Sequence, residues 1–142
     1  MTILCEIVSE DRLVYRDEVE IVVLPGAAGQ MGILPHHSPV LTALDYGIIT
    51  VRSKGIEEHF TVAGGVAEVL PEKVTILATA AENVEEIDFD RALKARERAE
   101  ERLKLTMATD ADRYMRVTTA LKRSNLRLQA VQKYRKSSKT KV

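Results

Sequence analysis

The sequence is poor in cysteine and has no long apolar run. Its single cysteine, Cys5, cannot form an internal disulfide, and it lies in an apolar, strand-like pattern that favours a buried structural thiol. No apolar stretch approaches the roughly 18–20 residues that a membrane-spanning helix needs. The first residues, MTILCEIVSED, lack the charged n-region and the long apolar core of a secretory signal. Together these absences predict a cytosolic or membrane-peripheral protein.

The usual signatures of catalysis are also missing from the sequence. We find no Ser-His-Asp candidate, no Gly-rich loop that precedes a helix and could cradle a phosphate, and no cluster of metal ligands. The pair His36-His37 would suggest a metal site only if carboxylates or cysteines converged on it, and His59 is isolated. We therefore expect neither a metal site nor an enzyme activity.

What the sequence does contain is a change of character at Ile87. Residues 1–87 contain 5 Lys and Arg against 14 Asp and Glu, a net charge of −9, whereas residues 88–142 contain 16 against 7, a net charge of +9. Halves of opposite charge usually meet different partners. A basic helical segment on an acidic β domain points to an acidic protein surface or a phosphate ligand as readily as to nucleic acid.

The first half is predicted to form a small antiparallel β-sandwich or barrel. Short runs rich in Val, Ile, Leu and Thr alternate with turn signals, as in such folds. The runs are 2–8, 13–15, 19–24, 47–52, 59–63, 66–70 and 74–79. Between the third and fourth runs lies a Gly- and Pro-containing loop, 26–39, that also carries Met31, Ile33 and Leu34. Apolar residues on a rigid loop can mark a contact surface, but Ile33 and Leu34 can equally plug one end of the sandwich.

The second half is predicted to form an antiparallel helical hairpin. Asp88 is a good N-cap for a first helix, and Thr109 or Asp110 can cap a second. Apolar stripes at steps of three, four and seven residues mark the facing sides. They comprise Ala92, Ala95, Ala99 and Leu103 in the first helix, and Tyr114, Val117, Leu121, Leu128 and Val131 in the second, with Ser124 at the missing position. A thin seam of small and polar residues should hold the helices weakly, as in a mobile element or in a helix pair that lies against another protein.

Arginines recur on the predicted helices at regular spacings. Arg91 and Arg98 share one face of the first helix, and Arg116, Arg123 and Arg127 share one face of the second. If the turn centres near residue 108, Arg123 and Arg127 flank Arg91 across the seam. Clustered guanidinium groups repel one another unless an anion sits among them. The alternative interpretation is a solvated basic face that pairs with nearby glutamates, which are Glu97, Glu100 and Glu101.

Three stretches carry a resemblance to a known family. GQMGILPHHSPVLTAL, then VAGGVAEVLPEKVTILATAAE, then IDFDRA at the head of a charged helix resemble the epsilon subunit of bacterial and chloroplast F-type ATP synthases. The resemblance runs from about Thr2 to Arg127. It implies an α+β fold in which an N-terminal antiparallel β-sandwich of about ten short strands, 1–86, precedes a C-terminal antiparallel two-helix hairpin, 87–134. A basic tail, 135–142, is predicted to be disordered.

The resemblance also implies a function without catalysis. Such a subunit belongs to the central stalk of a proton- or sodium-translocating ATP synthase, peripheral to the cytoplasmic face of the bacterial plasma membrane or its thylakoid equivalent. Its sandwich would bind the gamma subunit and the ring of c subunits, the latter through Gly32, Ile33, Leu34, His37 and Pro39. Its extended hairpin would meet the catalytic alpha and beta subunits and block ATP hydrolysis, through Arg116, Lys122, Arg123 and Lys133.

Some bacterial members of this family bind ATP between the two helices as a regulatory ligand. Their motif of Ile or Leu, Asp, two variable residues, Arg and Ala is matched in full by residues 87–92. The implied ATP-binding residues are Glu82, Ile87, Asp88, Arg91, Ala92, Arg98, Arg123 and Arg127. One departure is His36, which stands where the family usually has glycine. The basic tail is also longer than is typical and could add to docking on an acidic surface or an anionic membrane.

Two other classes of function fit the sequence less well. A nucleic-acid-binding module with a basic helical arm would need aromatic residues beside the basic ones, but Phe89, Tyr114 and Tyr134 are scattered, and the acidic half would repel a phosphate backbone. An enzyme would need one of the catalytic signatures that are missing. The sequence therefore favours a rotor subunit with no required cofactor, with nucleic acid binding as the alternative.

Overall fold

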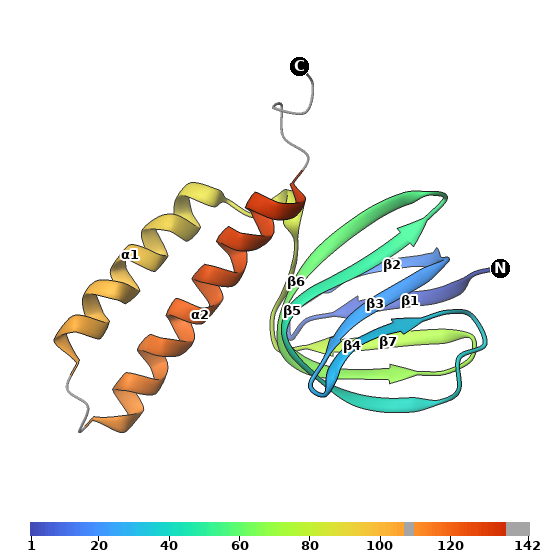
Figure 1. Cartoon of the computed structure of the whole chain (residues 1–142), viewed down its shortest axis with the longest axis horizontal. Helices are drawn as coiled ribbons and strands as arrows, with labels where there is room; N and C mark the ends of the chain where they lie inside the picture. The colour runs from blue at the N-terminus through green and yellow to red at the C-terminus, as the bar shows by residue number, and fades with distance from the viewer. Residues whose placement is uncertain (107–109, 136–142) are drawn as a thin grey trace, which may run out of the picture. The chain divides into compact units, whose positions relative to one another are not determined.

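The computed structural model describes residues 1–106 and 110–135. The chain divides into two compact units, Met1–Val84 and Glu85–Val142. The first unit is built of β-strands, and the second contains two α-helices (Figure 1). The strands are β1 (Ile3–Val8), β2 (Leu13–Val19), β3 (Ile21–Gly26), β4 (Gly29–Ile33), β5 (Val40–Ser53), β6 (Ile56–Val69), β7 (Lys73–Ala78) and β8 (Ala81–Asn83). A short 3-10 helix η1 (Val84–Glu86), α1 (Phe89–Leu105) and α2 (Ala111–Tyr134) follow.

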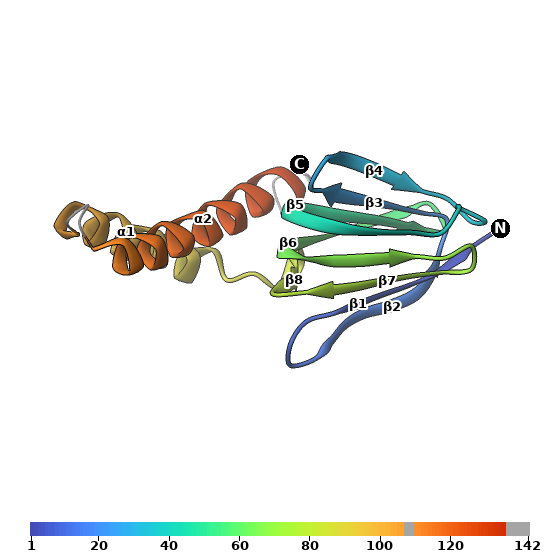
Figure 2. The ribbon, with the colours of Figure 1, turned by 90° about the horizontal axis from the view of Figure 1, so that it is seen from below.

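The strands of the first unit form one hydrogen-bonded sheet in the order β2-β1-β7-β6-β5-β3-β4, with β8 paired to β6. Neighbouring strands run antiparallel except β1 and β7, which are parallel. The long strands β5 and β6 bend, so the sheet folds over into two layers (Figure 2). The predicted sandwich followed by two helices is therefore confirmed, with a mixed rather than wholly antiparallel sheet.

The sheet has fewer and longer strands than the sequence indicates. β5 and β6 each contain 14 residues, so the eight strands replace the expected ten or so. Gly64-Gly65 separates two of the predicted runs, 59–63 and 66–70, as a turn would, but it is a bend inside β6 where both glycines have positive φ, 81° and 139°. Before the bend β6 pairs with β8, and from Gly65 onward it pairs with β7. Glycine is needed here because a Cβ on Gly65 would overlap the backbone of β7.

The core lies between the two layers and is almost entirely aliphatic. Its largest fully buried side chain is Phe60, whose ring packs against Tyr15 with the centroids 5.0 Å apart. Cys5 is buried in this core, as predicted, and burial raises the pKa of its thiol to about 12. Beside it, the outward-facing Glu6 forms ion pairs with Lys73 (Oε1–Nζ 2.5 Å) and Arg16. The hydrogen bond from Lys73 lowers the pKa of Glu6 below its ordinary value.

Part of the predicted loop 26–39 is a β-strand. β4 pairs with β3, and alternation along it sends Ile33 into the core, with none of its surface exposed, while Leu34 is 56% exposed. Ile33 therefore plugs the sandwich and Leu34 does not. His36 follows with φ 67°, a left-handed conformation that explains why glycine suits this position. Its N–H donates to the carbonyl of Pro71 at 2.8 Å, which fixes the turn.

In the second unit the predicted caps and seam are present. Asp88 caps α1 by accepting the N–H of Arg91 at 3.0 Å, and Asp110 caps α2 by accepting that of Arg113 at 3.1 Å. Thr109, the other predicted cap, lies outside the described residues. The buried seam residues are Ala92 and Ala99 from α1 and Val117, Ser124 and Leu128 from α2. Tyr114 departs from the predicted row, since it is 46% exposed.

Candidate functional site

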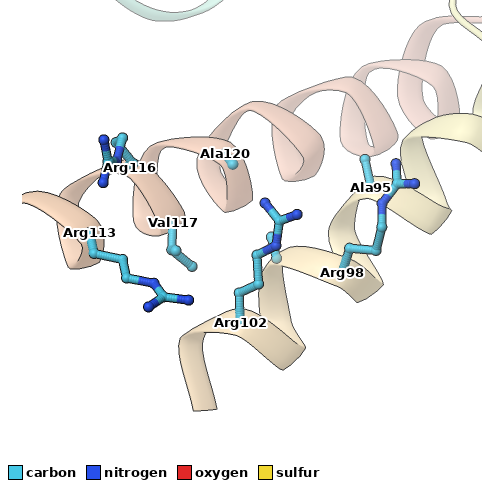
Figure 3. Close-up of a pocket in the computed structure, with 8 residues that line it drawn as sticks. Ala95, Arg98, Arg102, Arg113, Arg116, Val117 and Ala120 are labelled. Atoms are coloured by element: carbon cyan, nitrogen blue, oxygen red, sulfur yellow. The ribbon is translucent and has the colours of Figure 1, made fainter. Parts of the chain in front are cut away.

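A groove of about 490 Å³ runs between α1 and α2. Arg98 and Arg102 from α1, together with Arg113 and Arg116 from α2, line it over a base of small apolar side chains (Figure 3). The base residues are Ala95, Ala99, Val117 and Ala120. The groove lies toward the end of α1 and the start of α2, and we call it the distal groove. Half of the described residues that line it are arginines, and none of them is acidic.

The positions of the arginines follow from helix geometry. Arg98 and Arg102 are four residues apart, and Arg113 and Arg116 are three apart, so each pair shares one face of its helix. In Figure 3, Arg102 and Arg113 extend from opposite helices into the space between them. Ala99 and Val117 lie across from each other at equal chain distances from residue 108, which agrees with the predicted centre of the hairpin.

The arginines of the distal groove have no counter-ion among residues 1–106 and 110–135. Within these ranges their side chains make no hydrogen bond or ion pair. Glu100 is held instead by Arg96, which does not line the groove (Nε–Oε1 3.4 Å). Several guanidinium groups around an open groove raise the local positive potential, so this arrangement favours an anionic ligand.

The structure brings only part of the predicted ATP-binding set to the distal groove. Arg98 lines it, whereas Arg91, Arg123 and Arg127 do not. Glu82 belongs to β8 in the first unit, where it pairs with Thr61 of β6. Arg102 and Arg113 were missed by the sequence analysis. Their proximity could have been predicted, because both residues lie near the predicted turn at similar chain distances from residue 108 and therefore face each other in an antiparallel hairpin.

Three residues of the matched motif have structural roles in the hairpin. Asp88 is the N-cap of α1, and Ala92 is buried in the seam, where a small side chain lets α2 approach. Ile87 is buried, and its carbonyl accepts a hydrogen bond from the guanidinium of Arg135. Arg135 also pairs with Glu85 (Nε–Oε2 3.8 Å), so this residue, which was predicted to begin the tail, is held at the end of α2. The rest of the tail, 136–142, lies outside the described residues.

Two further sets of residues were predicted from the sequence, a c-ring contact in the first unit and an inhibitory contact in the second. In the predicted c-ring contact, Ile33 is fully buried, so its side chain cannot touch a partner at this surface. Gly32, Leu34 and Pro39 are exposed, and His37 is half-buried. All four residues of the predicted inhibitory contact are exposed on α2: Arg116, Lys122, Arg123 and Lys133. The ammonium of Lys133 lies 5.2 Å from the ring centroid of Tyr134.

Across 1–106 and 110–135, no group of three or more His, Cys, Asp or Glu side chains could hold a metal ion. None of the helices in these ranges is both long enough and apolar enough to cross a membrane.

Comparison with known families agrees with the two-unit architecture. The family model of the ATP synthase delta/epsilon chain β-sandwich domain matches residues 2–84, and that of the delta/epsilon chain long α-helix domain matches residues 85–132. The chain therefore belongs to the ATP synthase delta/epsilon chain family.

Individual relatives narrow this assignment. The chain is 40% identical over 137 residues to the ATP synthase epsilon chain of Dehalococcoides mccartyi, covering 92% of this chain and 93% of that one. It is 51% identical over 98 residues to the epsilon chain of Koribacter versatilis, covering 69% of each. It is thus an epsilon-type subunit of ATP synthase, a non-catalytic component of the central stalk.

Solved structures show the same fold. A chain in the mitochondrial ATP synthase of Euglena gracilis, determined as OSCP, F1 and c-ring, matches with a TM-score of 0.75 and 25% identity, covering 92% of this chain and 81% of that one. A chain in the central stalk and c-ring of the Tetrahymena thermophila enzyme matches with a TM-score of 0.62 and 14% identity, covering 92% and 97%. The second likeness shows the fold alone.

Proposed function

We propose that the helical hairpin is the regulatory element of this subunit and that it inhibits ATP hydrolysis by docking on acidic surfaces of the catalytic alpha and beta subunits. The observation that carries the proposal is the segregated charge of +9 on residues 88–142. Arg116 and Arg123 are seven residues apart on one face of α2, and Lys122 and Lys133 are eleven apart on another. These exposed cations can meet carboxylates without any change in the core of the hairpin.

The small apolar area buried between the two helices is consistent with a hairpin that can change conformation. Ala92, Ala99 and Ser124 bury little apolar area, so opening the helices exposes less surface than opening a Leu-rich pair would. A docked state that rests on Lys and Arg against carboxylates is screened by salt. We expect inhibition to weaken as ionic strength rises.

The test is ATP hydrolysis by the assembled enzyme with the parent subunit and three variants of it. Replacing Arg116, Lys122, Arg123 and Lys133 together by Ala should relieve inhibition while assembly is retained, and deleting everything after Asp88 should relieve it at least as much. A matched control that replaces Lys94 and Lys104 of α1 by Ala should leave inhibition in place. Equal hydrolysis rates for the parent, the α2 variant and the deletion would refute the proposal.

We propose that the sandwich makes the contacts with the gamma subunit and the c-ring. These contacts would hold the subunit at the cytoplasmic face of the membrane as a peripheral protein. An apolar row crosses its outer surface, since Val8 pairs with Leu77, Leu77 with Val66, and Val66 with Ala43. Leu77 is 57% exposed and Val66 is 40% exposed. Exposed apolar side chains in register on four adjacent strands are typical of an interaction surface.

A truncated subunit ending near Glu86 tests this division of roles. It should still bind gamma and support coupled ATP synthesis, and Leu77→Asp should weaken gamma binding in a pull-down. Ile56→Asp is the control, because Ile56 is 60% exposed but lies in the β5–β6 hairpin away from the row. Loss of both activities on truncation would overturn the proposal.

We also propose that ATP binds to the hairpin as a regulatory signal. The support is the matched motif, in which Asp88 and Ala92 build the hairpin while the side chain of Arg91 is exposed and available. Calorimetric titration of the whole subunit with ATP tests the proposal. Arg91→Ala and Arg123→Ala should each weaken binding about tenfold or more, since a charge-assisted hydrogen bond contributes on the order of 1.5–3 kcal/mol. Unchanged affinity in both variants would show that the motif does not bind nucleotide here.

A further inference from the structure

The distal groove has a ligand chemistry that the nucleotide motif does not account for. Arg102 and Arg113 belong to neither the predicted ATP-binding set nor the predicted inhibitory set, yet both line the groove. We propose that the distal groove is a separate binding site for free linear polyphosphates, with pyrophosphate and tripolyphosphate as its smallest ligands. This inference does not rest on nucleotide binding by the motif.

The charge of the groove matches a multiply charged phosphate anion. Arginines from both helices line the groove, with Arg102 and Arg113 extending into the space between the helices (Figure 3), and none is neutralised by a carboxylate within residues 1–106 and 110–135. A guanidinium presents parallel N–H donors that fit two oxygens of one phosphate group. A monovalent anion would leave most of this charge uncompensated, whereas a linked pair or triplet of phosphates can engage arginines of both helices at once.

The base of the groove favours a ligand without a nucleoside. Ala95, Ala99 and Ala120 are small, so a phosphate chain can approach the helix surfaces closely. Among the described residues, the lining contains no aromatic ring on which a base could stack, and no amide, hydroxyl or carboxylate side chain that could hydrogen-bond a base or a ribose. The described lining therefore offers positive charge to a phosphate chain and no side chain that is specific to a base or a ribose.

Distance along the helices separates this site from the motif. Arg102 lies 11 residues after Arg91, which is about 16 Å along the helix axis. Arg113 lies 14 residues before Arg127, about 21 Å along α2. A pyrophosphate, whose two phosphorus atoms share one bridging oxygen, is much shorter than either separation. Seated between Arg102 and Arg113, it lies away from Arg91 and Arg127, although Arg98 belongs both to the groove and to the predicted ATP-binding set.

The test is calorimetric titration of the whole subunit with sodium tripolyphosphate at constant ionic strength, near 0.1 M. The parent should bind saturably, and the double variant Arg102→Gln and Arg113→Gln should bind at least about tenfold more weakly. Both side chains are exposed, so the helices should stay folded, which circular dichroism verifies. Arg113→Lys keeps the positive charge but loses the parallel N–H donors of the guanidinium, and should weaken binding less than Arg113→Gln.

Two controls decide whether the effect belongs to the groove. The pair Lys94→Gln and Lys104→Gln removes the same charge from exposed positions of α1 outside the groove, and should leave tripolyphosphate affinity unchanged. Arg91→Gln reports on any tripolyphosphate that binds at the motif, and should weaken binding less than the Arg102 and Arg113 double variant. No saturable binding by the parent, or equal weakening by the lysine pair, overturns the proposal. Equal weakening by Arg91→Gln would mean that phosphate binds at the motif instead.

The two proposals fail separately. The nucleotide proposal fails if ATP affinity does not respond to Arg91→Ala or Arg123→Ala, whatever tripolyphosphate does. The polyphosphate site fails on the tripolyphosphate titration alone, because that ligand contains no adenosine and its test variants leave the motif intact.

Discussion

Substitutions at Asp88 can separate its role as a helix cap from the nucleotide contact that the family motif implies. The side chain accepts the N–H of Arg91, the third residue of α1, at 3.0 Å. Asn and Ser can make the same bond, whereas Ala cannot. We predict that Asp88→Ala loosens the start of α1, and that Asp88→Ser restores it and keeps the affinity for ATP close to that of the parent.

The magnitude follows from the cap. Loss of an N-cap hydrogen bond costs about 1 kcal/mol, which corresponds to about a fivefold fall in the protection of the first amides of α1 from hydrogen exchange. Asp88→Ser loses only the favourable interaction of the carboxylate with the helix dipole, about 0.3–1 kcal/mol. Asp110→Ala is the matched control, since Asp110 caps α2 in the same way and lies outside the motif.

Hydrogen exchange and ATP titration on the same four proteins complete the assay. Asp110→Ala should reduce protection at the start of α2 by a similar factor and leave that of α1 unchanged. The reasoning is refuted if Asp88→Ser keeps full protection but binds ATP tenfold more weakly. In that case the carboxylate of Asp88 contacts the nucleotide, and capping the helix is only its second role.

Three further predictions concern the sandwich. Gly65→Ala should lower the free energy of unfolding by about 3 kcal/mol or more, because φ is 139° and a Cβ would overlap the neighbouring strand; thermal denaturation measures this. His36→Gly should raise the free energy of unfolding by about 0.5–1 kcal/mol, since φ is 67°, whereas His37→Gly should lower it. Glu6 should titrate by NMR below the ordinary pKa of glutamate, and Lys73→Ala should raise its pKa. Because the folded pKa is depressed, the stabilisation by Glu6 should be complete at neutral pH and disappear as pH falls through the folded pKa; an ordinary titration midpoint in the parent would contradict this.

Features that depend on neighbouring residues in the chain could be predicted from the sequence. Asp88 and Asp110 cap helices because a short acceptor side chain reaches the N–H three residues on. The seam positions Ala92, Ala99 and Ser124 follow from helical spacing. The charge division at Ile87 is visible by counting. The matched motifs then place the chain in its family, although the roles of their residues remain predictions.

Other features were decided only by contacts between distant segments. Gly64-Gly65 looks like a turn, but its backbone is a bend because β8 and β7 both pair with β6. The sequence pattern leaves open whether Ile33 faces a partner or the core, and pairing of β4 with β3 settles it. Likewise, helical spacing shows which arginines share a face of one helix. Only the register and rotation of α1 against α2 bring Arg102 and Arg113 into one groove, since those depend on how the alanine seam packs and not on either helix alone.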